Sequence, residues 1–400
     1  MKICIFTETY YPVVGGGETQ ARLLAEGLVA CGHSVMILTR RSDESLKDHE
    51  TYGDVGVYRL SPIGSGQLKK WGLLLSSLPA LVRLRHQYDL IFVSGYRIIG
   101  LTAILVGKLF RKPVILKADS QGEMSGEFFT SGLTKFGATS TSFLFKLFIR
   151  FRNFVLKKAD AFSAISSEIA SEWSSSGIPS NKIHLIPNSV DTTRFTPVEL
   201  EQKRWLREKF ELPPEAFIAI YTGRLVSYKG LPLLLKVWNE IRNKHKEVML
   251  VLAGTGGLDI HNCENELHEY VKSNRLRYHI RFTGAIRNVA EYLQASDIFV
   301  FPTENDAFPS SVVEAMACAL PVIATPVGAI KTIITHGKNG VLIEPGNYQQ
   351  LFEALDVMVS NGSHFSQLGK AAMQTVRDQY SAQSSTAKYA SLFQHLLNSQ

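Results

Sequence analysis

Two series of short β-rich runs, separated by amphipathic helical stretches, constrain the fold of this chain more than any other feature. The runs are continuously apolar, which is typical of parallel strands covered on both faces by helices. The predicted strands are 2–7, 34–39, 89–94, 113–118 and 161–166 in the first series, and 217–223, 248–254, 279–284, 297–303 and 321–326 in the second. The sequence therefore predicts an α/β protein with two doubly wound units in tandem.

The alternation breaks between Pro187 and Pro214, where Pro, Asn and Asp residues typical of turns accumulate. Four hundred residues also exceed the size of one ordinary core. We therefore expect one domain over 1–195, a second over 196–380, and a polar closing helix over 381–400.

The composition narrows the class of protein. With 45% hydrophobic and 20% charged residues, the chain is neither disordered nor of low complexity. No apolar run approaches the roughly 18 residues of a membrane span, and the first residues predict a strand rather than a signal peptide. The four cysteines have no metal-ligand spacing, so we expect buried thiols in a reducing compartment.

Positive charge is concentrated in one block of the chain. From Lys69 to Lys158 there are fifteen Lys and Arg against four acids. Its last part, 143–158, intersperses large apolar residues with bases, as in helices that lie among anionic lipid headgroups. The candidate membrane contacts are Lys146, Arg150, Arg152, Lys157 and Lys158. A core helix with an exposed basic stripe is the alternative, and no motif for nucleic acid accompanies the charge.

In open parallel sheets, ligands bind outside the carboxyl ends of the strands. The first strand is followed by Gly15, Gly16 and Gly17, directly before a predicted helix. Glycine allows close approach of the backbone, and a helix N-terminus favours an anion such as phosphate. A tight turn that needs a positive φ is the alternative. The spacing is not that of a dinucleotide fingerprint, which disfavours a dehydrogenase.

Two cations, Arg224 and Lys229, follow the strand predicted at 217–223. They could stabilise the negative charge that grows on a departing pyrophosphate, because Arg offers a planar fork of donors and Lys a point charge. A solvated pair of surface charges is the alternative reading.

Two carboxylates follow the strand predicted at 297–303. Asp306 lies on the loop and Glu314 on an otherwise apolar helix that Ser310 could cap. Because a buried unpaired carboxylate is costly, we expect Glu314 to accept hydrogen bonds from the hydroxyls of a ribose. The alternative is a buried ion pair.

These motifs resemble those of the family-4 retaining glycosyltransferases of the GT-B fold along nearly the whole chain. The motifs are TETYYPVVGGGE, IPNSVDTTRF, GRLVSYKG, LAGTGG and DAFPSSVVEAMACALPVIATPVG. The resemblance implies two Rossmann-like domains facing across a cleft, with a nucleotide-diphosphate sugar as co-substrate and no metal or other cofactor.

The resemblance also implies roles for individual residues. Gly16 and Gly17 would lie under the donor phosphate or the reacting sugar, and Arg224 and Lys229 would hold the pyrophosphate. The remaining donor contacts would be Glu314 at the ribose, Asp306, Phe308, Pro309, Ser310 and Ser311 at the sugar, and Ile286 at the nucleobase. We expect Arg224, Lys229 and Asp306 to be catalytic.

The chain departs from the family pattern in two places. The paired glutamates of the family correspond here to Asp306 and Glu314, and the His that the family often carries in its first domain is absent. Near the place of that His, the candidate contacts for the acceptor or sugar are Lys117, Asp119, Ser120 and Glu123.

We therefore expect a metal-independent hexosyltransferase that is cytoplasmic or peripheral on the inner face of the cell membrane. Its acceptor would be a saccharide or lipid-linked saccharide of envelope or exopolysaccharide synthesis, and we expect no nucleic-acid partner. The alternatives are a nucleotide-sugar epimerase or hydrolase, and a non-catalytic transferase-like subunit.

Overall fold

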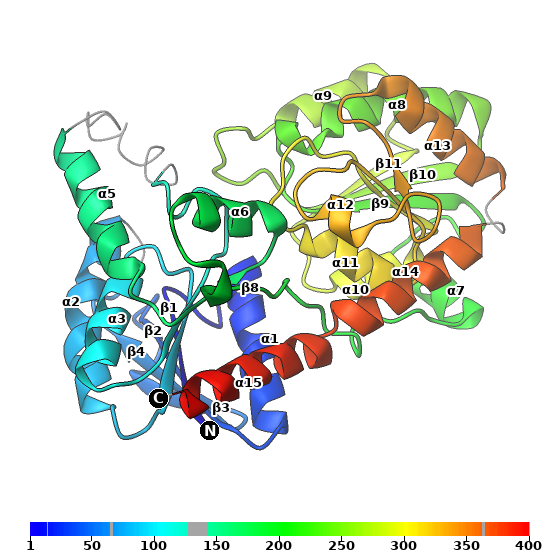
Figure 1. Ribbon diagram of the computed structural model, residues 1–400. Coiled ribbons are helices and arrows are strands. Elements are labelled where there is room, and N and C mark those ends of the chain that lie inside the picture. Colours follow the sequence, from blue (N-terminus) through cyan, green and yellow to red (C-terminus); the bar gives the residue numbers. More distant parts are fainter. Residues whose placement is uncertain (14, 65–66, 127–142, 362–364, 400) are drawn as a thin grey trace. The chain divides into compact units, whose positions relative to one another are not determined.

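A computed structural model describes residues 1–13, 15–64, 67–126, 143–361 and 365–399 (Figure 1). The chain divides into two units, Met1–Ser189 with Ala382–Gln400, and Val190–Ser381. Each unit is built on its own largely parallel sheet, so the predicted fold class is confirmed. The units change at residues 189 and 381, whereas the sequence analysis placed the boundaries after 195 and 380.

The first unit has an eight-stranded sheet in the order β3-β4-β2-β1-β5-β6-β7-β8. Its strands are β1 (Lys2–Thr7), β2 (Ser34–Arg40), β3 (His49–Tyr52), β4 (Val55–Leu60), β5 (Leu90–Ser94), β6 (Val114–Lys117), β7 (Ala161–Ala164) and β8 (Ile183–Leu185). β1 pairs in parallel with both β2 and β5. After β1 the chain first adds strands on the β2 side of the sheet and then, from β5 onward, on the opposite side of β1. The topological switch point therefore lies between β1 and β5.

The antiparallel hairpin of β3 and β4 is a difference from the sequence-based expectation. Buried and half-buried residues alternate along β4, so only one face of this strand packs on the core. The strand is therefore not a continuous apolar run, and the sequence did not predict it. A positive φ at Gly53 allows the tight turn between the two strands.

Helices cover the sheet of the first unit. They are α1 (Gly16–Ala30), α2 (Gln67–Arg83), α3 (Gly100–Leu109), α5 (Phe143–Leu156), α6 (Ser167–Ser175), the 3-10 helix η2 (Ser180–Lys182) and α15 (Ala382–Asn398). The carboxy-terminal α15 packs against α1, and its Tyr389 and Phe393 enter the core beside Phe92 of β5. The Tyr389 hydroxyl lies 2.7 Å from that of Ser163 on β7. The last helix is therefore part of the first unit's core.

The second unit has a six-stranded sheet in the order β11-β10-β9-β12-β13-β14, parallel throughout. Its strands are β9 (Phe217–Thr222), β10 (Val248–Ala253), β11 (Ile280–Gly284), β12 (Ile298–Phe301), β13 (Val322–Ala324) and β14 (Val341–Leu342). The switch point lies between β9 and β12, which pair directly. The loops after these two strands therefore meet at one edge of the sheet.

Helices also cover the sheet of the second unit. They are α7 (Leu200–Lys209), the 3-10 helix η3 (Ser227–Lys229), α8 (Leu231–Lys244), α9 (Glu264–Ser273), α10 (Val289–Ala295), α11 (Ser310–Ala317), α12 (Ile330–Ile333), α13 (Tyr348–Ser360) and α14 (Ser366–Gln379). The indole of Trp238 on α8 is fully buried and donates to the carbonyl of His279 beside β11. This contact fixes α8 on the sheet, and with it the end of the loop between β9 and α8.

The cysteines correct one expectation. Cys4, Cys263 and Cys318 are buried, as expected, but Cys31 is exposed. Cys31 caps the C-terminus of α1, just before Gly32 turns the chain back toward β2.

Candidate functional site

The two predicted cations lie at the carboxyl end of β9, at the switch point of the second unit. Arg224 lies two residues after the end of β9, and Lys229 ends the turn η3 before α8. Gly230 adopts a positive φ and lies against the carbonyl of Pro302, so a side chain there would collide with the loop after β12. The Tyr228 carbonyl also accepts a 2.8 Å hydrogen bond from the Glu304 amide. The two loops are thus bound together.

Lys229 and Asp306 form an ion pair across these two loops. The Lys229 Nζ lies 2.6 Å from the Asp306 Oδ2 and 3.2 Å from the carbonyl of Asn305. The Lys229 side chain is 9% exposed and that of Asp306 18% exposed. The sequence analysis assigned these residues to different parts of the donor, and the structure brings them into direct contact.

Arg224 is held from a third loop, the one that follows β10. Its guanidinium pairs with the Asp259 carboxylate, and its Nη2 donates to the Tyr228 hydroxyl at 2.8 Å. Arg224 remains 60% exposed. Asp259 was not among the predicted site residues, although it follows the LAGTGG motif and so also lies beyond the carboxyl end of a strand.

Glu314 projects from α11 and has no hydrogen-bond or ion-pair partner among the described residues. Its side chain is half-buried, and burial raises the pKa of Glu314 to about 7, against a smaller lowering by Arg194. A carboxylate in this state is available to accept hydrogen bonds from a ligand. The alternative of a buried ion pair has no support here.

The other donor candidates are arranged around these side chains. Phe308 and Pro309 are buried in the loop after β12, and the Phe308 ring packs near Tyr380. α11 begins at Ser310, but its N-cap is Pro309 and no side chain caps it, so the expected cap by Ser310 is wrong. Ser311 lies in the first turn of α11, and Ile286 on the loop that follows β11.

The candidates of the first unit also gather at its switch point. The Lys117 Nζ at the end of β6 donates to the Asp119 Oδ1 at 2.7 Å, and the Ser94 hydroxyl at the end of β5 lies 3.4 Å from the same oxygen. Burial opposes the charge of Lys117, but Asp119, Tyr389 and Glu123 outweigh burial and the pKa of Lys117 is raised. The Lys117 ammonium is therefore charged.

Ser120 and Glu123 form the inner part of this cluster. The Glu123 Oε1 accepts from the Ser120 hydroxyl at 3.1 Å and from the Arg97 Nε at 3.2 Å. Burial raises the pKa of Glu123 to about 7, with Arg97 lowering it and Asp119 raising it. Arg97 was missed, although it comes three residues after β5 and so follows a strand end.

The loop that carries Asp119 is fixed from a second side. The Glu172 carboxylate on α6 accepts the amide hydrogens of Gly122, Met124 and Ser125 at 2.9–3.1 Å. Lys117, Arg97 and Glu172 therefore hold this short loop from three neighbouring elements, which is a requirement for a site that must orient a ligand.

The basic helix α5 departs from prediction at one residue. Arg152 is fully buried, donating at 2.6 Å to the carbonyl of Arg97 and at 2.8 Å to that of Glu123. It cannot contact a membrane, and the assignment is wrong because this position faces the core at helical spacing. The other four assigned bases are exposed, namely Lys146, Arg150, Lys157 and Lys158.

Apolar side chains share the exposed surface of α5. Leu147, Phe151 and Phe154 are 52%, 62% and 62% exposed. α3 packs beside α5 and exposes Leu105 and Leu109 in the same way. The exposed side of α5 thus carries apolar side chains as well as bases.

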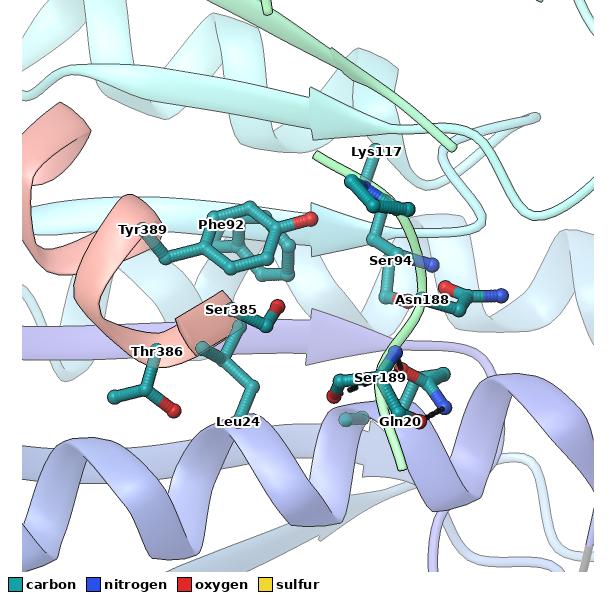
Figure 2. Close-up of a pocket in the computed structure, with 12 residues that line it drawn as sticks. Gln20, Leu24, Phe92, Ser94, Lys117, Asn188, Ser189, Ser385, Thr386 and Tyr389 are labelled. Carbon is teal, nitrogen blue, oxygen red and sulfur yellow. Dashed lines mark hydrogen bonds between the residues drawn. The ribbon is translucent and has the colours of Figure 1, made fainter. Parts of the chain in front are cut away.

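Lys117 and Ser94 also line a small cavity of the first unit (Figure 2). Its lining is rich in hydroxyl and amide groups from α1, the strand ends and α15. The lining residues are Gln20, Ala21, Leu24, Phe92, Ser94, Lys117, Pro187, Asn188, Ser189, Ser385, Thr386 and Tyr389. Gln20 closes one side, since its amide exchanges two 2.8 Å hydrogen bonds with the backbone of Ser189.

Among the described residues, no group of three or more His, Cys, Asp or Glu side chains is arranged to hold a metal ion. Within the ranges that the structure describes, no helix has both the length and the apolar character needed to cross a membrane.

Comparisons with known proteins agree with this arrangement. The family described as Glycosyltransferase Family 4 matches residues 14–194, and that described as Glycosyl transferases group 1 matches 202–375. The D-inositol 3-phosphate glycosyltransferase of Pseudarthrobacter chlorophenolicus is 25% identical over 386 residues, covering 93% of this chain and 88% of that protein.

Solved structures share the fold. Sucrose-phosphate synthase from Thermosynechococcus elongatus superimposes with a TM-score of 0.78 at 20% identity, covering 100% of both chains. Anabaena HepE in complex with UDP-glucose gives 0.75 at 17% identity, covering 98% of this chain and 99% of that one.

Proposed function

Because the chain belongs to the GT-B glycosyltransferases, with a family-4 domain followed by a group-1 domain, we propose that it is a metal-independent retaining hexosyltransferase. Its donor is a nucleotide-diphosphate sugar and its acceptor a saccharide hydroxyl. The observation that carries the proposal is the switch point of the second unit. Arg224 and Lys229 follow β9 there, and Glu314 projects from α11 after the adjacent β12 without a hydrogen-bond or ion-pair partner among the described residues.

The mechanism follows from the charges at this switch point. As the bond between the anomeric carbon and the diphosphate oxygen breaks, negative charge grows on the diphosphate, and Arg224 and Lys229 stabilise it. The acceptor oxygen bonds to the anomeric carbon from the same face, and its proton passes to the departing diphosphate. Glu314 accepts hydrogen bonds from the ribose, while Asp306 and the first turn of α11 contact the sugar.

A thermal-shift screen tests the donor. The probes are UDP-glucose, GDP-mannose and ADP-glucose, each with and without Mg²⁺, beginning with UDP-glucose because HepE was solved with it. We expect one of them to raise the melting temperature without metal. No shift with any probe, for folded protein, would favour a non-catalytic subunit. Release of free nucleotide at the full rate without an acceptor would favour a hydrolase.

For the acceptor we propose a lipid-linked saccharide at an anionic membrane surface, as in envelope or exopolysaccharide synthesis. The support is the exposed face of α5, where Phe151 and Phe154 lie among Arg150, Lys157 and Lys158. Aromatic and aliphatic side chains enter the headgroup layer while the bases meet lipid phosphates.

Vesicle sedimentation tests this surface. Reversing Arg150, Lys157 and Lys158 to Glu should abolish binding to vesicles of phosphatidylglycerol and phosphatidylcholine. The matched control reverses three exposed bases of the second unit, Lys236, Lys272 and Arg277, and should bind like the unmodified protein. Equal binding by both variants would refute the membrane surface.

A further inference from the structure

Tyr228 lies where the three loops at the switch point of the second unit meet. It belongs to the turn η3, in the loop after β9. Its carbonyl accepts hydrogen bonds from the loop after β12, namely from the Glu304 amide at 2.8 Å and from the Thr303 hydroxyl at 3.2 Å. Its ring meets the ring of His261, in the loop after β10, edge to face with 5.4 Å between the centroids. Two further loops therefore fix Tyr228 before a ligand binds.

Tyr228 also contacts both cations of this site. Its hydroxyl accepts a 2.8 Å hydrogen bond from the Arg224 Nη2. The Lys229 Nζ lies 5.3 Å from the centre of the Tyr228 ring and 5.2 Å from the centre of the Phe301 ring. A cation beside the face of an aromatic ring is attracted by the negative charge of that face. One side chain thus orients Arg224 through its hydroxyl and Lys229 through its ring.

The hydroxyl of Tyr228 still has a hydrogen to donate. A phenol can donate one hydrogen bond and can also accept. The Arg224 guanidinium uses the acceptor side, and in the part of the chain that the structure describes no residue accepts the hydroxyl hydrogen. Donation by the charged guanidinium also polarises the hydroxyl, which strengthens its own donation to a further acceptor. This arrangement favours an anionic ligand beside Arg224.

The hydroxyl keeps its proton at neutral pH. Burial raises the pKa of Tyr228 above its ordinary value of 10.0, and the opposing effect of Arg224 is smaller. Asp259 and Asp306 raise this pKa further. The Tyr228 side chain is only half-buried, so a ligand can reach it. Tyr228 is therefore a neutral, accessible hydrogen-bond donor between two cations.

These three groups suit a diphosphate better than a carboxylate. A diphosphate carries acceptor oxygens on two phosphorus atoms, so Arg224, Lys229 and Tyr228 can each bind a different oxygen. The Asp259 carboxylate uses one oxygen for Arg224 and the other for the His261 amide, at 3.0 Å. It therefore leaves the hydrogen of the Tyr228 hydroxyl without an acceptor.

We infer that the Tyr228 hydroxyl donates a hydrogen bond to the diphosphate of the nucleotide sugar, beside Arg224 and Lys229, while its ring orients the Lys229 ammonium. This inference rests on the proposed function, to which it adds a residue of the diphosphate site. Negative charge on the diphosphate grows as the bond to the sugar breaks, so this hydrogen bond is stronger in the transition state than in the bound nucleotide sugar.

Tyr228→Phe tests the hydroxyl, because it keeps the ring beside Lys229 and His261. Calorimetry measures the binding of UDP, GDP and ADP, and steady-state kinetics measures kcat and KM with the matching nucleotide sugar. The control is Tyr278→Phe, which removes the hydroxyl of an exposed tyrosine of the same unit whose ring also lies near an arginine, Arg277. The melting temperature without ligand is measured for each variant.

We expect Tyr228→Phe to bind the diphosphate about tenfold more weakly and to have a lower kcat, as for a lost hydrogen bond to a charged group. Its melting temperature without ligand should be unchanged, which separates this role from a structural one. Tyr278→Phe should match the unmodified protein in every measurement. Equal binding of the diphosphate by Tyr228→Phe and the unmodified protein would overturn the inference. Tighter binding would show that the hydroxyl competes with the diphosphate for Arg224, and would overturn it as well.

Tyr228→Leu tests the ring, because it removes both the hydroxyl and the aromatic face beside Lys229. We expect a lower kcat than for Tyr228→Phe, and equal kcat values for the two variants would refute the role of the ring. If the unmodified protein binds none of the three diphosphates, the proposed function fails too. Failure of the inference by itself leaves that binding intact.

Discussion

The Nζ of Lys229 lies 2.6 Å from the Oδ2 of Asp306, joining the loops that follow the two strands at the switch point of the second unit. The pair has little solvent around it, since neither side chain is more than a fifth exposed. Lys229 is therefore held in position before any ligand arrives. A preorganised charge costs no reorganisation when negative charge develops on a departing group.

Replacing Lys229 by Ala should reduce kcat by about a hundredfold or more, as for other lost electrostatic contacts to a transition state. Steady-state kinetics with the donor found in the thermal-shift screen measures the loss. Lys244→Ala is the matched control, because Lys244 also pairs with an aspartate of the second unit, Asp356, but is 55% exposed on α8. Equal turnover by both variants would exclude Lys229 from the reaction.

Asp259 competes with a diphosphate for Arg224. In the Arg224–Asp259 ion pair the Arg224 side chain is largely exposed, and exposed ion pairs contribute little to stability. A ligand can therefore replace Asp259 as the partner of Arg224. Asp259→Asn should therefore tighten the binding of UDP, GDP or ADP severalfold, with a larger gain at low ionic strength, where repulsion is less screened. Calorimetry at two salt concentrations measures this. Weaker binding would show instead that Asp259 positions Arg224.

The pKa of Glu314 predicts a dependence of stability on pH. Because burial raises this pKa from 4.5 to about 7, the folded state holds a proton that the unfolded state has lost between these values. Stability from this group is therefore full below pH 4.5 and declines as the pH rises to 7. Glu314→Gln should melt at the same temperature as the unmodified protein at pH 4, and a few degrees higher at pH 8. The pKa of Glu123 is also raised to about 7, but Glu123 is present in both proteins, so its effect on the melting temperature cancels in the comparison. Equal melting temperatures at pH 8 would contradict the burial of this carboxylate.

The sequence predicted the strand ends better than the partners found there. Continuous apolar runs identify parallel strands, and ligands bind at their carboxyl ends, so Arg224, Lys229 and Glu314 could be selected by position. The pairing of Lys229 with Asp306 depends on β9 lying beside β12, which no local pattern encodes. Asp259 and Arg97 lie on loops without a distinctive motif. They become recognisable only when the fold brings a residue of opposite charge to them.

Helical spacing accounts for the error at α5. Bases at four of the five assigned positions are exposed, while Arg152 turns inward and bonds to carbonyl groups that follow β5 and β6. Composition cannot distinguish these cases. The long apolar stem of Arg allows a base on the core face of a helix, provided that its guanidinium finds acceptors.

Arg152 and Arg150 provide a matched pair of substitutions on one helix. Arg152→Met leaves the carbonyl groups of Arg97 and Glu123 without their donor, and should lower the free energy of unfolding by about 3–5 kcal/mol. Arg150→Met removes an exposed charge and should change it by less than about 0.5 kcal/mol. Urea unfolding measures both. The two variants should differ in the opposite sense in vesicle binding. Arg150→Met should bind vesicles more weakly than the unmodified protein. Arg152→Met should bind them as well as the unmodified protein does, at temperatures where the variant is folded. Equal losses of stability would contradict the inward orientation of Arg152.

The contact between Gly27 and Thr386 fixes the distance between α1 and the carboxy-terminal helix α15. A Cβ on Gly27 would collide with the Thr386 hydroxyl, and that hydroxyl is buried with no hydrogen-bond partner in the described ranges. In an isolated helix, Gly→Ala would stabilise by about 1 kcal/mol. Here we expect Gly27→Ala to destabilise, by about 1–3 kcal/mol, because the methyl group forces the helices apart.

Thr386→Ala should have a small effect, since it removes a buried unsatisfied hydroxyl. The double variant should recover most of the loss, giving a coupling energy of about 1 kcal/mol or more in a double-mutant cycle by urea unfolding. Additive effects of the two substitutions would show that the helices do not meet at this point.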